Sequence, residues 1–263
     1  MNRPNTNMNR PNIKKEPLFS YHVWDRSVRV FHWVNVICII GLVVVGLAIL
    51  YNKNFGVSSD GKILLKTIHA YIGYVFVLNL GYRLIWGFIG NKYSKWTLNL
   101  PFGKNRIDQL VSFVRGMKEG HPPPYAGHNP LAKIMVTFLF LLLITQAITG
   151  LLLAGTDLYL PPFGHEIAEW VTDSGEDHSK LDKLKPGSKE FVDPESYKEM
   201  RAFRKPFITV HKYGFYILLI AIFLHIFAVV YTELKERNGL ISAMFTGEKV
   251  FSEKPVDIND NEH

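Results

Sequence analysis

The sequence predicts an all-α integral membrane protein in which four membrane-spanning helices form a bundle. Of its 263 residues 48% are hydrophobic, and these residues are concentrated in long segments rather than spread evenly. A hydrocarbon core about 30 Å thick needs about 20 helical residues to span it. Four segments are long and apolar enough, namely residues 30–51, 63–90, 131–155 and 207–231. Polar residues interrupt the second, which is expected to tilt or to extend past the membrane.

The remaining chain divides into tails and connections. Residues 1–18 are basic and rich in Asn and Pro, so we expect a disordered cytoplasmic tail. No apolar stretch follows at the distance of a cleaved signal peptide, and the first span is therefore expected to act as the insertion signal. Residues 19–247 are expected to form the membrane domain, and residues 248–263 a cytoplasmic C-terminal tail.

The distribution of basic residues predicts the orientation in the membrane. Lys and Arg number six in residues 1–29 and six in residues 91–130, but only three in the connection 52–66. Cytoplasmic loops carry the excess of basic residues. We therefore expect both termini and residues 91–130 in the cytoplasm, and residues 52–66 and 156–206 outside. The net charge of +7 then belongs to the membrane surface, and no nucleic-acid partner is expected.

Two connections show further patterns. Residues 104–118 predict a short amphipathic helix, which either lies on the cytoplasmic membrane surface or covers the end of the bundle. Asn129 and Pro130 suit the N-cap and first helical position of the third span. Residues 172–200 are polar and charged, and are expected to be a mobile insertion. The apolar stripe of the amphipathic helix comprises Ile107, Leu110, Val111, Val114 and Met117.

Four of the ten histidines lie within the spans or at their edges, and they carry the functional argument. The other six lie in tails or loops, where solvated side chains are expected: His22, His121, His128, His165, His178 and His263. His211 and His225 are fourteen residues apart, which puts them on one helical face about 21 Å apart along the axis. In the predicted topology the depth of His211 matches that of His69 on the second span, and the depth of His225 matches that of His32 on the first span, once a tilt of the first helix is allowed. The predicted pairs are therefore His32 with His225 and His69 with His211.

Two imidazoles facing each other fill both axial positions of a haem iron and leave none for oxygen or substrate. Such a site carries electrons, and helix bundles commonly hold such cofactors. The sequence thus predicts a four-helix bundle with two haems between its helices, one near each membrane surface. Histidine packing or a proton relay remains an alternative, because ionisable residues in membranes also form relays. A zinc site fits less well, since zinc needs its ligands close together.

Two arginines are expected to position haem propionates. Arg83 lies fourteen residues after His69, at the depth of His225, and its forked donors suit a carboxylate, although a long side chain also snorkels to the surface. Arg29 precedes His32 by about one turn.

Other residues of the spans have open or structural roles. Gln146 is a polar group at mid-depth that contacts a neighbouring helix, a haem or a quinone. Cys38 is expected to be a packing residue, and no Cys-x-x-Cys-His motif for covalent haem is present. Glycines allow close approach of helices or of a flat ring: Gly41, Gly46, Gly73, Gly150 and Gly214.

Several segments resemble the prokaryotic cytochrome b561 family of di-haem membrane b-type cytochromes. "DRSVRVFHW" (25–33) resembles the first-helix pattern of that family, and "HAYIGY" (69–74) resembles its second-helix histidine motif. "RLIWGFIGNKY" (83–93) and "GHNPLA" (127–132) resemble the exit from its second helix and the entry to its third. The resemblance covers about residues 19–247, and the long connection 156–206 departs from the shortest members.

The resemblance implies two non-covalent haems b held by the four histidines in an inner-membrane electron carrier. Relatives exchange electrons with membrane quinones, periplasmic c-type cytochromes or hydrogenases. We therefore expect electron transfer between the quinone pool and a periplasmic redox partner such as a c-type cytochrome, and the acidic connection 156–206 suits docking of a lysine-rich one. An electron carrier is favoured over a stand-alone enzyme. The alternatives are an anchor subunit of a hydrogenase or other respiratory complex, a quinone reductase acting on a small donor such as superoxide, and a haem-free transporter.

Overall fold

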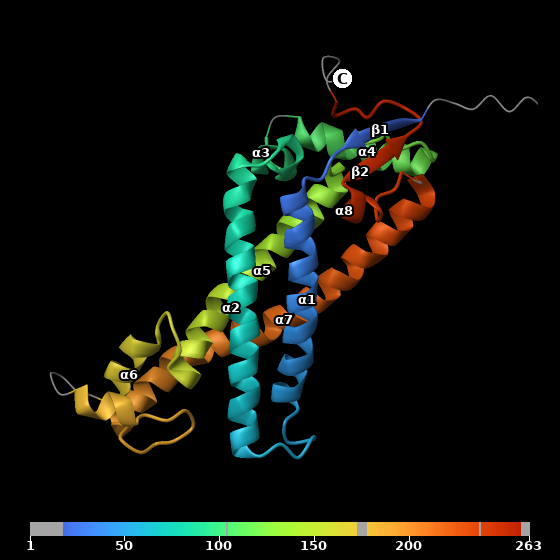
Figure 1. Ribbon diagram of the computed structural model, residues 1–263. Coiled ribbons are helices and arrows are strands. Elements are labelled where there is room, and N and C mark those ends of the chain that lie inside the picture. Colours follow the sequence, from blue (N-terminus) through green and yellow to red (C-terminus); the bar gives the residue numbers. More distant parts are fainter. Residues whose placement is uncertain (1–17, 104, 173–177, 237, 259–263) are drawn as a thin grey trace, which may run out of the picture.

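Four long helices dominate the structure, a computed structural model that describes residues 18–103, 105–172, 178–236 and 238–258 (Figure 1). Each is long and apolar enough to cross a membrane. Their bounds are α1 Arg26–Leu50, α2 Ser59–Ile89, α5 Pro130–Leu158 and α7 Pro194–Glu236. The prediction of an all-α, four-helix membrane protein is therefore confirmed.

Side-chain caps fix where three of these helices begin. Asp25 accepts a hydrogen bond from the backbone N–H of Val28 at the start of α1, and Ser58 caps α2 in the same way. Asn129 accepts from Ala132 at the start of α5, with Pro130 at the first helical position. Each cap satisfies a backbone donor that the helix itself leaves unpaired. The predicted entry into the third span is thus confirmed.

The fourth helix begins well before the span that its hydropathy predicts. Residues 194–200, expected within a mobile insertion, form the first turns of α7. Met200 is buried there against Ile167 and Val171 of α6, Gly164–Thr172. This small core supports a helix whose composition is too polar to reveal it, and residues 173–177 lie outside the described part of the chain. A short 3₁₀-helix, η2 His178–Lys183, lies between α6 and α7.

Both tails of the described chain meet at one end of the bundle, which we call the terminal end. Strand β1, Phe19–His22, pairs antiparallel with β2, Glu248–Phe251, beside the short helix α8, Ala243–Thr246 (Figure 1). Residues 248–258, expected as a free tail, are therefore packed. Alternate residues Lys249 and Phe251 are buried, a period-2 pattern too short to stand out in the sequence. The predicted tail 1–18 is outside the described residues except for its last position.

The opposite end, which we call the loop end, carries the turn after α1 and the helix α6 (Figure 1). Helices α1 and α5 run from the terminal end to the loop end, and α2 and α7 run back. The terminal end also carries η1 Lys92–Ser94, α3 Trp96–Asn99 and α4 Arg106–Glu119. The two ends correspond to the two membrane surfaces that the four spans require.

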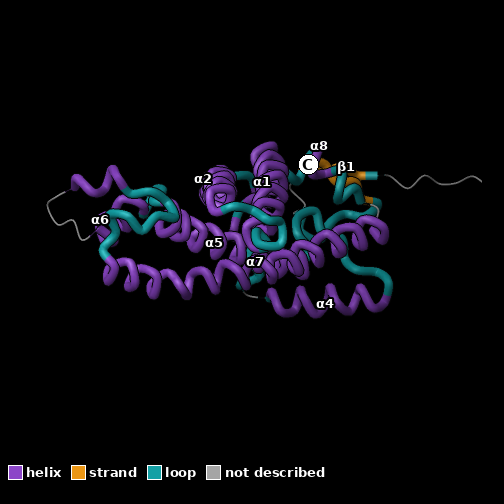
Figure 2. Tube along the Cα trace, turned by 90° about the horizontal axis from the view of Figure 1, so that it is seen from below, coloured by secondary structure: helices purple, strands orange, loops and turns teal. Residues whose placement is uncertain are grey.

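Helix α4 lies at the terminal end, outside the four long helices (Figure 2). Phe113 and Gly116 are buried, and Leu110 and Val114 of the apolar stripe expected from the sequence are half-buried. Ile107 and Val111 of that stripe are 76% and 51% exposed. Gly116 is required because an added Cβ would lie 2.8 Å from the carbonyl oxygen of His121. Ile107 and Val111 are thus free to face lipid headgroups.

The long helices pack as two hairpins that cross obliquely (Figure 1). Helices α1 and α2 pack closely, as do α5 and α7, and α2 joins the hairpins through α5. A core of Cys38, Phe76, Leu80, Leu143 and Leu218 lies where the four helices meet. Side chains on the outer faces remain exposed, as expected for a surface whose solvent is hydrocarbon.

Candidate functional site

The structure brings His69 of α2 and His211 of α7 face to face near the loop end. Their ring centroids are 6.3 Å apart, and the ring planes are nearly perpendicular, at 78°. A metal–imidazole bond is about 2 Å long. Because each ring nitrogen lies about 1 Å from its ring centre, two imidazoles on opposite sides of one metal ion have centroids about 6 Å apart. The pair therefore has the separation that axial ligation of one iron requires.

A hydrogen bond from α5 selects the tautomer of His211. Thr149 Oγ1 lies 2.9 Å from His211 Nδ1 and 2.7 Å from the carbonyl oxygen of Thr145. The threonine hydroxyl has only one hydrogen, which it donates to that carbonyl, so its oxygen accepts from His211 Nδ1–H. The lone pair of His211 is then on Nε2. Ligating histidines are commonly oriented by such an outer hydrogen bond.

Glycines lie against both rings of this pair. A Cβ added at Gly46 of α1 would lie 3.4 Å from Cε1 of His69, and one added at Gly150 of α5 would lie 3.4 Å from Cε1 of His211. A methyl group there is just tolerated, whereas any branched side chain would displace the imidazole.

Gln146 of α5 also contacts this pair through the backbone. It donates from Nε2 to the backbone carbonyl of His211, so it contacts a neighbouring helix, one of the roles considered for it.

The second pair, His32 of α1 and His225 of α7, lies toward the terminal end. Both side chains are half-buried, and they are close enough to interact electrostatically. The ring of His32 is perpendicular to that of Trp33, with centroids 5.2 Å apart, and His32 Nδ1 has no hydrogen-bond partner among the described residues. Helix α7 makes few close backbone approaches to α1 or α2, so the histidines extend between helices that do not otherwise pack tightly.

Arg83 and Arg29 also lie at the terminal end, and each keeps a buried N–H that no described residue accepts. Arg83 is only 5% exposed, so it does not snorkel to water. Its Nη2 donates to the carbonyl of Ser94 at 3.0 Å, whereas Nη1 is unpaired. Arg29 Nη1 donates to the carbonyl of Phe245, and its Nε is unpaired. A buried unpaired donor costs about 1–3 kcal/mol, which an anionic acceptor at this site would offset.

His128, expected to be a solvated loop residue, is instead packed at the terminal end. Its Nδ1 lies 2.7 Å from Asn99 Oδ1, and its ring lies 4.8 Å from that of Trp24. Burial, together with the charges of Lys249 and Arg83, lowers the pKa of His128 to about 3. The imidazole is therefore neutral at pH 7. The motif "GHNPLA" gave its position but not its surroundings, which are set by the distant residues Trp24, Asn99 and Lys249.

Asp25 supplies a hydrogen-bonded carboxylate at the terminal end. Asp25 accepts from Trp86 Nε1 at 2.9 Å and from Ser94 Oγ at 2.6 Å, in addition to capping α1. Although burial opposes ionisation, these hydrogen bonds hold the pKa of Asp25 below its ordinary value. Asp25 thus stays ionised close to Arg83.

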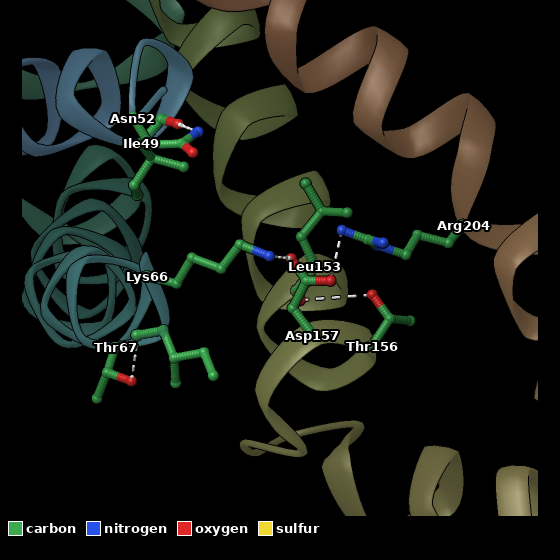
Figure 3. Close-up of polar contacts among 9 residues, drawn as sticks. Ile49, Asn52, Lys66, Thr67, Leu153, Thr156, Asp157 and Arg204 are labelled. Atoms are coloured by element: carbon green, nitrogen blue, oxygen red, sulfur yellow. Dashed lines mark hydrogen bonds and ion pairs between the residues drawn. The ribbon is translucent and has the colours of Figure 1, made fainter. Parts of the chain in front are cut away.

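The loop end contains an ion cluster that the sequence did not reveal. Asp157 of α5 pairs with Lys66 of α2, Nζ to Oδ2 at 2.6 Å, and with Arg204 of α7 (Figure 3). The sequence does hold one signal for this cluster, the spacing of its basic residues from the histidines. Lys66 precedes His69 by one turn, and Arg204 precedes His211 by seven residues. Within the described chain, no three His, Cys, Asp or Glu side chains gather as a metal site of their own.

Comparisons with known proteins identify a family and several similar proteins. Residues 23–247 match the family described as prokaryotic cytochrome b561. The chain is 27% identical over 252 residues to a probable Ni/Fe-hydrogenase B-type cytochrome subunit of Rhodobacter capsulatus, covering 90% of this chain and 84% of that protein. It is 26% identical over 238 residues to the corresponding protein of Bradyrhizobium diazoefficiens, covering 88% and 86%. A probable Ni/Fe-hydrogenase 1 B-type cytochrome subunit of Escherichia coli is 31% identical over 146 residues, covering 52% and 61%.

Proposed function

The chain belongs to the prokaryotic cytochrome b561 family, and from that premise we propose that it transfers electrons across the membrane on two haems b. His69 and His211 would hold the haem near the loop end, and His32 and His225 the haem near the terminal end. When bound, each haem iron supplies a site that accepts and releases one electron. The observation that carries the proposal is the 6.3 Å separation of the His69 and His211 rings.

The chain's own residues perform the supporting chemistry. His211 presents the Nε2 lone pair because Thr149 Oγ1 accepts a hydrogen bond from its Nδ1–H. Two histidines on one iron would leave no position for oxygen, so each site would transfer electrons. Arg83 and Arg29 would donate their unpaired N–H groups to propionates of the haem near the terminal end, and so orient it. The unpaired donors of these two arginines support that role.

The partner that we propose is the catalytic subunit of a respiratory complex, with a hydrogenase as the leading candidate. The names of the relatives favour this alternative over a soluble c-type cytochrome, since each is named as a probable Ni/Fe-hydrogenase B-type cytochrome subunit. In the orientation that the basic residues predict, the terminal end is cytoplasmic and the loop end faces outward. The catalytic subunit would then dock at the loop end, and a membrane quinone would accept the electrons.

The first experiment is a reduced-minus-oxidised visible spectrum of the purified protein, with haem extracted and counted per chain. Two non-covalent, low-spin haems per chain are expected. A colourless protein, made with haem available, would reject electron transfer and favour the proton relay.

Purification from native membranes tests the partner. A catalytic subunit that co-purifies supports the respiratory complex. Oxidation of a small donor by the isolated chain with quinone alone would instead favour the quinone reductase.

A further inference from the structure

The ion cluster of Lys66, Asp157 and Arg204 carries an inference about the loop-end haem. Its three side chains come from three different helices and are largely buried, with exposed fractions of 27%, 15% and 16% (Figure 3). A single carboxylate accepts about four hydrogen bonds, whereas an ammonium and a guanidinium together offer about eight donors. The cluster has a net charge of +1, and Arg204 Nε is buried without a partner among the described residues. It therefore lacks one anionic acceptor.

All three residues lie on the faces that carry the loop-end histidine pair. Lys66 is three residues before His69 on α2, which puts it on the same face about 4.5 Å closer to the loop end. Arg204 is seven residues before His211 on α7, on the same face and about 10 Å closer to the loop end. Asp157 is seven residues after Gly150, the glycine that lies against the His211 ring. The cluster thus stands on the membrane-surface side of the pair.

We propose that this cluster anchors a propionate of the loop-end haem and sets the electrostatic potential at its iron. Lys66 and Arg204 donate to the propionate oxygens, and Asp157 keeps these two cationic side chains in position. One propionate added to the net charge of +1 makes the site neutral, which a partly desolvated site favours. The inference rests on the proposed function, because it requires a haem between His69 and His211.

An electrostatic role predicts shifts of opposite sign. Reduction adds a negative charge to the haem, so nearby cations favour the reduced form and anions favour the oxidised form. Asp157→Asn should raise the midpoint potential of one haem, and Lys66→Met and Arg204→Gln should lower it. Arg204→Lys, which keeps the charge, should retain most of the original potential. A cluster that only ties α2, α5 and α7 together would instead lower stability in every variant and leave both potentials unchanged.

The test is a spectroelectrochemical titration of the full-length haem-loaded protein, which resolves two midpoint potentials. Arg201→Gln is the matched control, because it removes the same charge from an exposed position on the same helix. Resonance Raman bands of the propionates give a second readout that depends on their hydrogen bonds. Opposite shifts confined to one haem, with Arg201→Gln unchanged, support the inference.

Two results would overturn it, and they are distinguishable from failure of the proposed function. Cluster variants that bind two haems with unaltered potentials and unaltered propionate bands reject the anchor alone. Shifts of equal sign in Asp157→Asn and Arg204→Gln reject the electrostatic role. Wild-type protein that binds no haem rejects the proposed function itself, and this is established before any variant is made.

Discussion

Thr149 and His211 are joined across α5 and α7 by a hydrogen bond of 2.9 Å that leaves Nε2 of the histidine free for a metal. Thr149→Val removes the acceptor while keeping the shape of the side chain. Because outer hydrogen bonds of this kind are worth about 10–100-fold in metal affinity, we expect weaker retention of the loop-end haem. Haem per chain after gel filtration measures the effect.

Thr149→Ser is the control for this prediction, since it keeps the hydroxyl group. It should retain haem as the wild type does. If Thr149→Val and Thr149→Ser behave alike, the hydroxyl does not position His211.

The pairing of the histidines predicts the result of His225→Ala. This change removes one ligand of the terminal-end haem and leaves His69 and His211 untouched. Haem content should fall from two to one per chain, and the remaining haem should keep a low-spin spectrum. His121→Ala, at an exposed loop position, serves as the control. Retention of both haems in His225→Ala would show that the ligands or pairs are assigned wrongly.

The glycine beside His211 predicts a steric effect. Gly150→Val would bring branched methyl groups against an imidazole that an added Cβ already approaches to 3.4 Å. We expect the loop-end haem to be lost, with the terminal-end haem retained. Gly81→Val is a matched control within α2, because an added Cβ there meets no atom within 4 Å. Equal haem loss in both variants would point to a general effect on helix packing.

His128 predicts a dependence of stability on acid. Its pKa is about 3 in the folded protein, below the value of about 6.5 expected in the unfolded chain. The unfolded chain therefore binds the proton first, and stability falls as the pH drops below about 6.5. At about 1.4 kcal/mol per pH unit, the loss is at most about 2 kcal/mol at pH 5.

Thermal unfolding in detergent at pH 7 and pH 5 measures this loss. His128→Asn keeps a donor for Asn99 and removes the titrating group, so its melting temperature should fall less on acidification. His121→Asn, exposed in the same connection, should behave as the wild type does. A wild type and a His128→Asn variant with equal acid sensitivity would exclude His128 as the source.

Hydropathy and helical spacing were sufficient to predict the spans and to place the four histidines in depth. They located Arg83 and the cap Asn129, because such signals are local in sequence. They did not reveal the first turns of α7 or the packing of β2, since those elements are short or polar and are stabilised by distant residues. Asp157, Lys66 and Arg204 form a cluster only after three helices pack, so the spacing of Lys66 and Arg204 from the histidines did not by itself reveal it.

One continuous helix, α7, supplies a histidine to each pair. The helical interval between His211 and His225 therefore fixes the distance between the two sites. It also fixes the rotation of one histidine relative to the other about the helix axis. Inserting or deleting a single residue in this interval would turn one histidine by about 100° away from its partner. An interval of this kind tolerates substitution far better than any change of length.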